Sequence, residues 1–277
     1  MKKYLVICNP ISHSLSPILP TYWLKNYNID AFYEKRLIEE KDLKTLCDEV
    51  REGIIEGFNG TVPYKEKIKK HLDGFTLEAS DTNAVNTVFR KWEGGNFIAM
   101  GDNTDVYGFQ KSCSIQEGRA LIIGAGGATR AVMKGLSKLK VKSFAIINRT
   151  KENVEKLLQE VILSNNPKTF IYEWCKDEGS MQKPDIIINC TSLGLKNEDR
   201  IPLDFSKYKK KFFNKKIIFY DLIYNPAETN FLKNAKNIGQ QAINRNMMFI
   251  FQAQKSLNRW HKLLHKINQE VSYLLHD

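Results

Sequence analysis

The stretch "RALIIGAGGATRAVMKGLSKL", residues 119–139, is the most informative about the fold of the second half of the chain. It predicts a strand, a glycine-rich turn and a helix. Directly after it, "KSFAIINRT" (142–150) predicts a second strand, followed by a helix over 151–163. "PDIIINCTSLG" (184–194) and "KKIIFYDLIYNP" (215–226) predict two more strands, the former apolar throughout, as in a sheet covered on both faces. Strands that alternate with helices indicate a parallel, doubly wound sheet.

The glycine-rich turn has the pattern Gly124-x-Gly126-x-x-Thr129. Between a strand and a helix, this pattern is typical of a dinucleotide site. Gly124 permits the tight turn, and Gly126 lets a pyrophosphate approach backbone N–H groups at the start of the helix. We therefore expect Gly124, Gly126, Gly127 and Ala128 to bind a cofactor. The alternative is a glycine-rich turn that binds nothing.

The end of the second strand indicates which dinucleotide is bound. NAD sites usually have Asp or Glu there, to hold a ribose hydroxyl. This chain has Asn148, Arg149 and Thr150 instead. A guanidinium with two small polar groups suits the 2′-phosphate of NADP, and it can also stack on adenine. The alternative for Arg149 is a surface residue at a strand end.

The first half is less regular. Strands are expected at 4–8 and 31–37, a helix after Pro17, and a helix over 40–52. "GIIEGFNGTVPYK" (53–65) predicts a strand that runs into a loop, and residues 93–95 predict the turn of a hairpin. The stretch from about 244 to 274 is expected to be helical. The fold class is therefore α/β with two domains.

Composition limits the possible functions. The chain has 277 residues, 42% of them hydrophobic, and a net charge of +11, which attracts anions. Its basic residues are scattered, so neither nucleic acid nor membrane is the expected partner; a small anionic molecule is. Five cysteines without C-x-x-C spacing suggest no disulfide framework and no metal site, and no segment approaches the about 20 apolar residues of a membrane span. We expect a cytoplasmic protein, monomeric or homodimeric.

Polar clusters follow the strands of the first half. The motifs "SHSLSP" (12–17), N-x-T-x-P-x-K (59–65), "AVNT" (84–87) and G-D-N-T-D-x-x-G (101–108) precede "GAGGA", "NRT", N-x-T-S-x-G (189–194) and D-x-x-Y-x-P (221–226). In this order they resemble shikimate dehydrogenase, which reduces 3-dehydroshikimate with NADPH in aromatic amino acid (chorismate) biosynthesis. The resemblance covers nearly the whole chain.

The resemblance implies roles for individual residues. Lys65 and Asp105 match the catalytic pair that moves a proton at the C–O oxygen. Matches to the cofactor site, beyond those named above, are Thr191 and Leu222, the latter as an apolar wall for the nicotinamide. The substrate-binding positions are Ser14 and Ser16 for the carboxylate, Thr61 and Asn86 for the ring hydroxyls, and Tyr224 and Gln252.

The resemblance also implies a division of labour. A substrate-binding domain would comprise residues 1–105 plus 243–277, and a Rossmann-like NADP-binding domain residues 106–242, with a cleft between them. Two alternatives stay open. One is a quinate/shikimate dehydrogenase with relaxed substrate and NAD/NADP choice, and the other is a sensor that binds NADP(H) or shikimate-like acids without turnover.

Three departures from the family pattern stand out. Gly60 replaces the family's valine, which would loosen the loop that carries Lys65. Asn153 stands where many NADP-dependent members have a second arginine, with Lys151 as a substitute. Arg245 and Met247 replace small or flexible residues close to the expected place of the nicotinamide.

Overall fold

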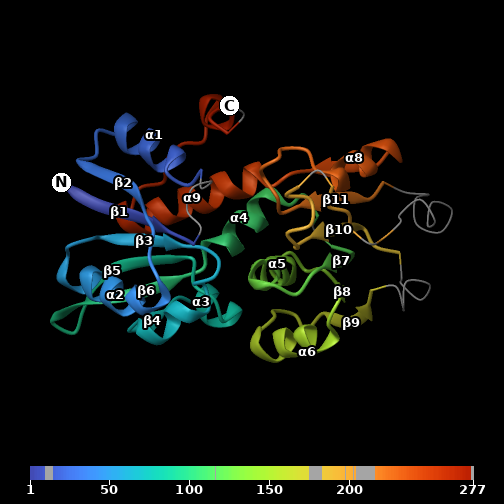
Figure 1. Ribbon diagram of the computed structural model, residues 1–277, viewed down its shortest axis with the longest axis horizontal. Coiled ribbons are helices and arrows are strands. Elements are labelled where there is room, and N and C mark those ends of the chain that lie inside the picture. Colours follow the sequence, from blue (N-terminus) through green and yellow to red (C-terminus); the bar gives the residue numbers. More distant parts are fainter. Residues whose placement is uncertain are drawn as a thin grey trace. The chain divides into compact units, whose positions relative to one another are not determined.

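The computed structural model describes residues 1–9, 15–115, 117–174, 183–196, 198–201, 203 and 216–275. The chain divides into two compact units: unit 1, residues 1–109 with 248–277, and unit 2, residues 110–247 (Figure 1). Among the described helices, none is long and apolar enough to cross a membrane.

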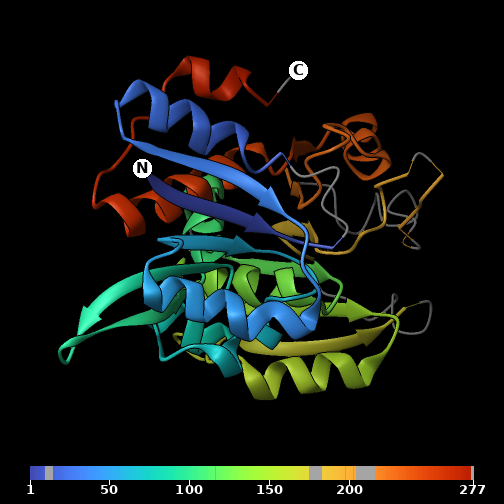
Figure 2. The ribbon, with the colours of Figure 1, turned by 60° about the vertical axis from the view of Figure 1, so that its left-hand side comes forward.

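Unit 1 contains a six-stranded mixed sheet in the order β2-β1-β3-β5-β6-β4. Strands β1, β2 and β3 are parallel, whereas β5 runs antiparallel to both β3 and β6. Figure 2 shows the β5–β6 hairpin as a long curved ribbon. The strands are β1 (Lys2–Ile7), β2 (Ala31–Arg36), β3 (Gly57–Gly60), β4 (Gly74–Phe75), β5 (Thr87–Glu93) and β6 (Asn96–Asp102).

Helices cover both faces of this sheet because β1 alternates its side chains between them. Leu5 and Ile7 belong to one apolar core with α2, and Tyr4 and Val6 to another with α1 and α9 (Figure 1). Helix α2 is amphipathic, as the spacing of its apolar residues predicts, and its C-cap is Gly53 with a φ of 77°. The helical segments of unit 1 are α1 (Ile18–Asn26), η1 (Glu40–Asp42), α2 (Leu43–Glu52), η2 (Lys67–His71), α3 (Leu77–Thr82), α4 (Thr104–Ser112, which continues into unit 2), α9 (Asn246–His261, which begins in unit 2) and α10 (Gln269–Tyr273).

The C-terminal segment corrects one expectation. The predicted continuous helix over 244–274 is two helices, because Lys262 after α9 adopts a left-handed φ of 58°. The side chain of Asn268 then accepts from the N–H of Val271 and begins α10. The apolar spacing continued through the break, so it could not reveal the break.

Unit 2 contains a six-stranded, fully parallel sheet in the order β12-β11-β10-β7-β8-β9. This order, with the reversal between β7 and β10, is that of the doubly wound dinucleotide-binding fold and confirms the expected fold class. Strands β9 and β12, at the two edges, were not predicted. The elements are β7 (Arg119–Ile123), α5 (Gly127–Lys138), β8 (Ser143–Asn148), α6 (Lys151–Glu160), β9 (Lys168–Glu173), β10 (Ile186–Asn189), β11 (Ile218–Asp221), α8 (Asn230–Asn237) and β12 (Gln241–Ile243).

Candidate functional site

Lys65 lies on the loop that follows β3, and the backbone of that loop is held on both sides. The buried Tyr64 donates its hydroxyl proton to the carbonyl of Ile38 at 2.6 Å. The N–H of Val85 donates to the carbonyl of Lys65 at 2.8 Å. The loop therefore presents the lysine side chain from a fixed backbone.

Asp105 lies in the first turn of α4 and meets the lysine there. The Lys65 Nζ to Asp105 Oδ2 distance is 2.6 Å, and the two side chains are 12% and 4% exposed. An ammonium beside a carboxylate, both largely removed from water, can hold and move a proton at a third oxygen. The structure thus brings together the two residues that the resemblance assigns to catalysis.

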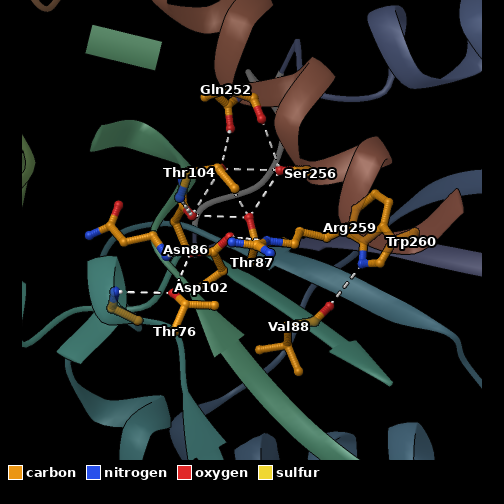
Figure 3. Close-up of polar contacts among 12 residues, drawn as sticks. Thr76, Asn86, Thr87, Val88, Asp102, Thr104, Gln252, Ser256, Arg259 and Trp260 are labelled. Carbon is orange, nitrogen blue, oxygen red and sulfur yellow. Dashed lines mark hydrogen bonds and ion pairs between the residues drawn. The ribbon is translucent and has the colours of Figure 1, made fainter. Parts of the chain in front are cut away.

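Asn86 is buried at the turn before β5, and its amide has a defined orientation. The backbone N–H of Thr104 donates to Oδ1 of Asn86 at 2.8 Å, and this N–H can act only as a donor. The hydroxyls of Thr87 and Thr104 also donate to Oδ1, at 3.0 and 3.1 Å (Figure 3). With Oδ1 so occupied, Nδ2 faces away as a donor.

The other residues expected to bind the substrate lie on several different elements. Gln252 is on α9, and its Oε1 lies 3.5 Å from the Thr104 hydroxyl. Thr61 follows β3, and Ser16 is half-buried just before α1. Ser14 lies outside the described residues. Tyr224 belongs to unit 2, whereas the other described members of this set belong to unit 1.

Helix α9 is fastened to the sheet by contacts that the sequence did not reveal. Arg259 donates from Nε to the buried carboxylate of Asp102 at 2.5 Å (Figure 3). Trp260 donates from its indole N–H to the carbonyl of Val88 at 3.0 Å. A Cβ on Gly57 would lie 2.3 Å from that indole nitrogen, so only glycine fits beneath it. No short motif contains these pairs, which is why they were missed.

The glycine-rich turn of unit 2 needs its first glycine for two reasons. Gly124 has a φ of 102°, and a Cβ there would lie 2.7 Å from Cγ2 of Thr191. Thr129, the third position of the motif, is buried and donates its hydroxyl proton to the carbonyl of Gly124 at 3.0 Å. The threonine at this position therefore stabilises the turn by a hydrogen bond to its first residue.

The start of α5 suits an anion. Its N-cap is Gly126, which provides no side-chain cap, and a Cβ built on Gly126 would meet no atom within 4 Å. Helix N-termini bind phosphate through backbone N–H groups and the helix dipole. Gly126, Gly127 and Ala128 thus fit the pyrophosphate of a dinucleotide.

The end of β8 provides the polar groups expected for a 2′-phosphate. Arg149 is exposed, between the half-exposed Asn148 and Thr150. Asn148 donates from Nδ2 to the carbonyl of Thr150 at 2.7 Å, which shapes the turn into α6. Lys151 pairs with Glu155 at 3.8 Å on the surface of that helix.

Asn189 and Asp221, at the ends of adjacent strands, order two loops of unit 2. Asn189 donates to Asp221 Oδ1 at 3.0 Å and accepts from the N–H and the hydroxyl of Thr191. Asp221 in turn accepts from the N–H of Ile223 at 3.0 Å and from the hydroxyl of Thr229 at 2.5 Å. Burial raises the pKa of Asp221 to about 6, although these hydrogen bonds oppose the shift. The loops carrying Thr191, Leu222 and Tyr224 are therefore shaped by one buried carboxylate.

Two of the departures have a structural counterpart. Gly60 is the last residue of β3, where its N–H donates to the carbonyl of Asn86 at 2.9 Å and the next N–H, of Thr61, donates to Ile7. The backbone at Gly60 is therefore held by hydrogen bonds on both sides, and a looser loop stays a prediction. Arg245 lies with its guanidinium 5.9 Å from the ring centre of Tyr224, in the same unit.

Comparison with known proteins agrees with this arrangement. Residues 6–88 match the family model of the shikimate dehydrogenase substrate binding domain, and residues 109–201 match that of shikimate / quinate 5-dehydrogenase. The chain is 41% identical over 279 residues to shikimate dehydrogenase (NADP(+)) of Pelagibacter ubique, covering 99% of this chain and 98% of that protein. The chain belongs to the shikimate dehydrogenase family.

Solved structures of shikimate dehydrogenases have the same fold. That of Aquifex aeolicus superposes with a TM-score of 0.84 at 32% identity, covering 100% of this chain and 97% of that one. That of Thermus thermophilus, in complex with NADP(H) and shikimate, gives a TM-score of 0.82 at 28% identity, covering 100% of this chain and 99% of that one. The shikimate dehydrogenase fold thus extends over the whole chain.

Proposed function

We propose that this chain catalyses the reversible, NADPH-dependent reduction of 3-dehydroshikimate to shikimate. The observation that carries the proposal is the largely buried Lys65–Asp105 pair at 2.6 Å, in the same unit as the Asn86 and Gln252 amides. Unit 1 would bind the substrate and unit 2 the cofactor. A net charge of +11 favours two anionic ligands.

In the proposed mechanism Lys65 carries the proton. In the reducing direction its ammonium donates a proton to the carbonyl oxygen, which becomes the hydroxyl of shikimate. In the oxidising direction its neutral amine takes that proton back. Asp105 accepts a hydrogen bond from Lys65 and can accept one from the same hydroxyl, which orients the C–O bond. NADPH, when bound, supplies the hydride that adds to the carbonyl carbon.

Further residues would hold the two ligands. Asn86 and Gln252 would donate to ring oxygens, Thr61 would contact a ring hydroxyl, and Ser14 and Ser16 would bind the carboxylate. Tyr224 would contact the substrate from unit 2. The cofactor would lie on Gly124, Gly126, Gly127 and Ala128, with its 2′-phosphate on Asn148, Arg149 and Thr150 and its nicotinamide against Thr191 and Leu222.

A spectrophotometric assay tests the proposal. The purified protein should reduce NADP with shikimate as the donor, with much lower kcat/KM for NAD and for quinate. Arg149→Gln should raise the KM for NADP while leaving the KM for NAD nearly unchanged, because only NADP has the 2′-phosphate. Comparable efficiency with quinate and NAD would instead establish the relaxed quinate/shikimate enzyme. Ligand binding without turnover would establish a sensor.

We also propose a reducing, cytoplasmic location. Cys8, Cys47, Cys113 and Cys190 are free thiols among the described residues, as expected of a protein that matures without disulfides. We expect the protein to be a monomer or a homodimer, and light scattering can distinguish the two.

A further inference from the structure

Three hydroxyl groups from three different elements meet behind the expected substrate-binding amides. They belong to Thr87 on β5, Thr104 on α4 and Ser256 on α9, and all three residues are at most 1% exposed. Their oxygens are 2.9 Å (Thr87–Ser256), 3.1 Å (Thr87–Thr104) and 3.2 Å (Thr104–Ser256) apart (Figure 3). We call them the hydroxyl cluster.

Asn59 determines the direction of the hydrogen bonds that enter the cluster. The Tyr33 hydroxyl donates to Oδ1 of Asn59 at 2.8 Å, so the amide nitrogen of Asn59 faces the cluster. That nitrogen donates to Thr87 at 2.9 Å and to Ser256 at 3.0 Å. The same nitrogen also lies 3.2 Å from the main-chain carbonyl of Asn86, so its two protons are shared among three acceptors. Toward Asn59 the hydroxyls of Thr87 and Ser256 therefore act as acceptors, and each keeps its own proton to donate elsewhere.

The protons leaving the cluster end on Asn86 and Gln252. Thr87 donates to Oδ1 of Asn86 at 3.0 Å, and Ser256 donates to the main-chain carbonyl of Gln252 at 3.0 Å. The one hydroxyl proton of Thr104 can be donated to Oδ1 of Asn86 at 3.1 Å, more weakly to Oε1 of Gln252 at 3.5 Å, or to the hydroxyl oxygen of Ser256 at 3.2 Å. With the other two protons so donated, the last of these is the hydrogen bond that links Ser256 to the other two hydroxyls. Oδ1 of Asn86 and Oε1 of Gln252 thus face the cluster (Figure 3). Because the nitrogen and oxygen of a planar amide point in different directions, the NH₂ groups are left to face the other side.

Ser256 is the member that joins the helix to the sheet. It lies one turn after Gln252 on α9, so its hydroxyl sets the height and rotation of that turn relative to Thr87 and Thr104. An apolar residue of similar size would pack equally well against a sheet. A buried hydroxyl with four polar neighbours instead specifies one arrangement, since each misplaced partner would be left unsatisfied.

We propose that Ser256 is a positioning residue for the reaction. Through the hydroxyl cluster it holds Asn86 and Gln252 at a fixed separation, with only their N–H donors presented to the substrate. This inference rests on the proposed function, because it assigns the two amides to the binding of the ring oxygens.

Steady-state kinetics of Ser256→Ala test the proposal. We expect the KM for shikimate to rise by about five- to twentyfold, as for the loss of one or two hydrogen bonds, with kcat reduced much less. Affinity for NADP, measured by fluorescence titration, should not change, because the cofactor residues belong to unit 2. Asn258→Ala, on the same helix but outside the cluster, is the matched control and should leave both constants as they are.

Thr87→Val is a second, nearly isosteric substitution that removes a hydroxyl from the same cluster. It should raise the KM for shikimate as Ser256→Ala does, and the double variant should lose less than the product of the two factors, since both remove one network. With a deoxy analogue of shikimate that lacks the non-reacting hydroxyl held by these amides, the effect of Ser256→Ala should shrink to less than about twofold, because the amide donors then have no oxygen to hold.

The outcomes are distinguishable. If the unmodified protein is active but Ser256→Ala and Thr87→Val keep its KM for shikimate, the positioning role is overturned. That role is equally overturned if every deoxy analogue shows the full effect of Ser256→Ala. If the unmodified protein does not reduce NADP with shikimate, the proposed function fails first, and this inference with it.

Discussion

Lys65 differs from the many other lysines of the chain by its surroundings. Its side chain is 12% exposed and contacts a carboxylate, whereas Lys67, two residues along, is 44% exposed and pairs with Glu40 at the surface. Exposed ion pairs contribute little to stability and leave a flexible side chain in water, so Lys67 has no fixed position comparable to that of Lys65. The two lysines therefore form a matched pair for testing catalysis.

We predict that Lys65→Ala lowers kcat by about 10²- to 10⁴-fold with a much smaller change in the KM for shikimate, because a proton carrier acts in the transition state. Lys67→Ala should keep the kcat of the unmodified enzyme. Initial rates of NADP reduction measure both. A near-unchanged kcat in Lys65→Ala would remove this residue from the catalytic role.

At the scale of the elements, glycines determine how closely α9 approaches its neighbours. Gly108 of α4 lies against α9: a Cβ there would be 2.6 Å from the carbonyl oxygen of Met248 and 3.0 Å from Cβ of Gln252. By contrast, a Cβ on Gly60 would have ordinary contacts, the nearest 3.8 Å from Ile7, and its φ is not in the left-handed region. The last glycine of G-D-N-T-D-x-x-G is thus a packing requirement, and Gly60 is not.

We predict opposite effects for the two alanine substitutions. Gly108→Ala should lower the free energy of unfolding by about 1–3 kcal/mol through overpacking, and it should raise the KM for shikimate because α9 carries Gln252. Gly60→Ala should be neutral or stabilising by up to about 1 kcal/mol, since it removes conformational freedom from the unfolded chain only. Urea denaturation measures both; a stable Gly108→Ala variant with normal kinetics would show that the helices are not in close contact.

In the molecule as a whole, each unit contains a buried group whose pKa is shifted, and the two shifts give opposite dependences of stability on pH. In unit 2, burial raises the pKa of Asp221 from 3.8 to about 6, so the folded state binds the proton more tightly than the unfolded state. In unit 1, burial lowers the pKa of His261 from 6.5 to about 4, with the neighbouring His265 and Lys2 adding to the shift. His265, also buried, has a lowered pKa for the same reason.

The signs follow from linkage. The stability that the raised pKa of Asp221 contributes is fully present below about pH 4 and is lost as the pH rises through about 6. The stability that the lowered pKa of His261 contributes is fully present above about pH 6.5 and is lost as the pH falls through about 4. We predict that Asp221→Asn makes the protein lose more stability on acidification than the unmodified protein does, and that His261→Gln makes it lose less. One such group changes the slope of the free energy of unfolding against pH by at most about 1.4 kcal/mol per pH unit, and the half-buried histidine changes it by less.

Urea denaturation between about pH 4 and 6.5 distinguishes these slopes from constant effects of the substitutions. Either substitution can shift the stability at every pH by altering packing or hydrogen bonds, but only the loss of a titrating group changes the slope. If the curves of both variants run parallel to that of the unmodified protein, the pKa values of Asp221 and His261 do not differ between the folded and unfolded states, and the prediction is wrong.

The local structure of this protein could be predicted from its sequence. Alternating strands and helices in residues 119–243 specify a doubly wound sheet, because hydrophobic periodicity and the glycine turn act within a few residues of each other. The sequence did not predict the short edge strands β9 and β12, because they form only by pairing with a neighbouring strand. It did not predict the helix break after His261 either, because a single left-handed residue causes it. Among the site residues, Lys65 and Asp105 came from motif resemblance, since nothing in their own spacing separates them from other charged residues.

The contacts between residues far apart in the sequence became known from the folded structure. Lys65 and Asp105 are 40 positions apart, and Thr87 and Ser256 are 169 apart. Such contacts depend on the strand order β1-β3-β5-β6 and on the return of α9 to unit 1, which bring side chains together without any sequence signal at fixed spacing. The chemistry of the site is therefore a property of the assembled sheet and helix, because burial and hydrogen-bond geometry arise only when both are in place.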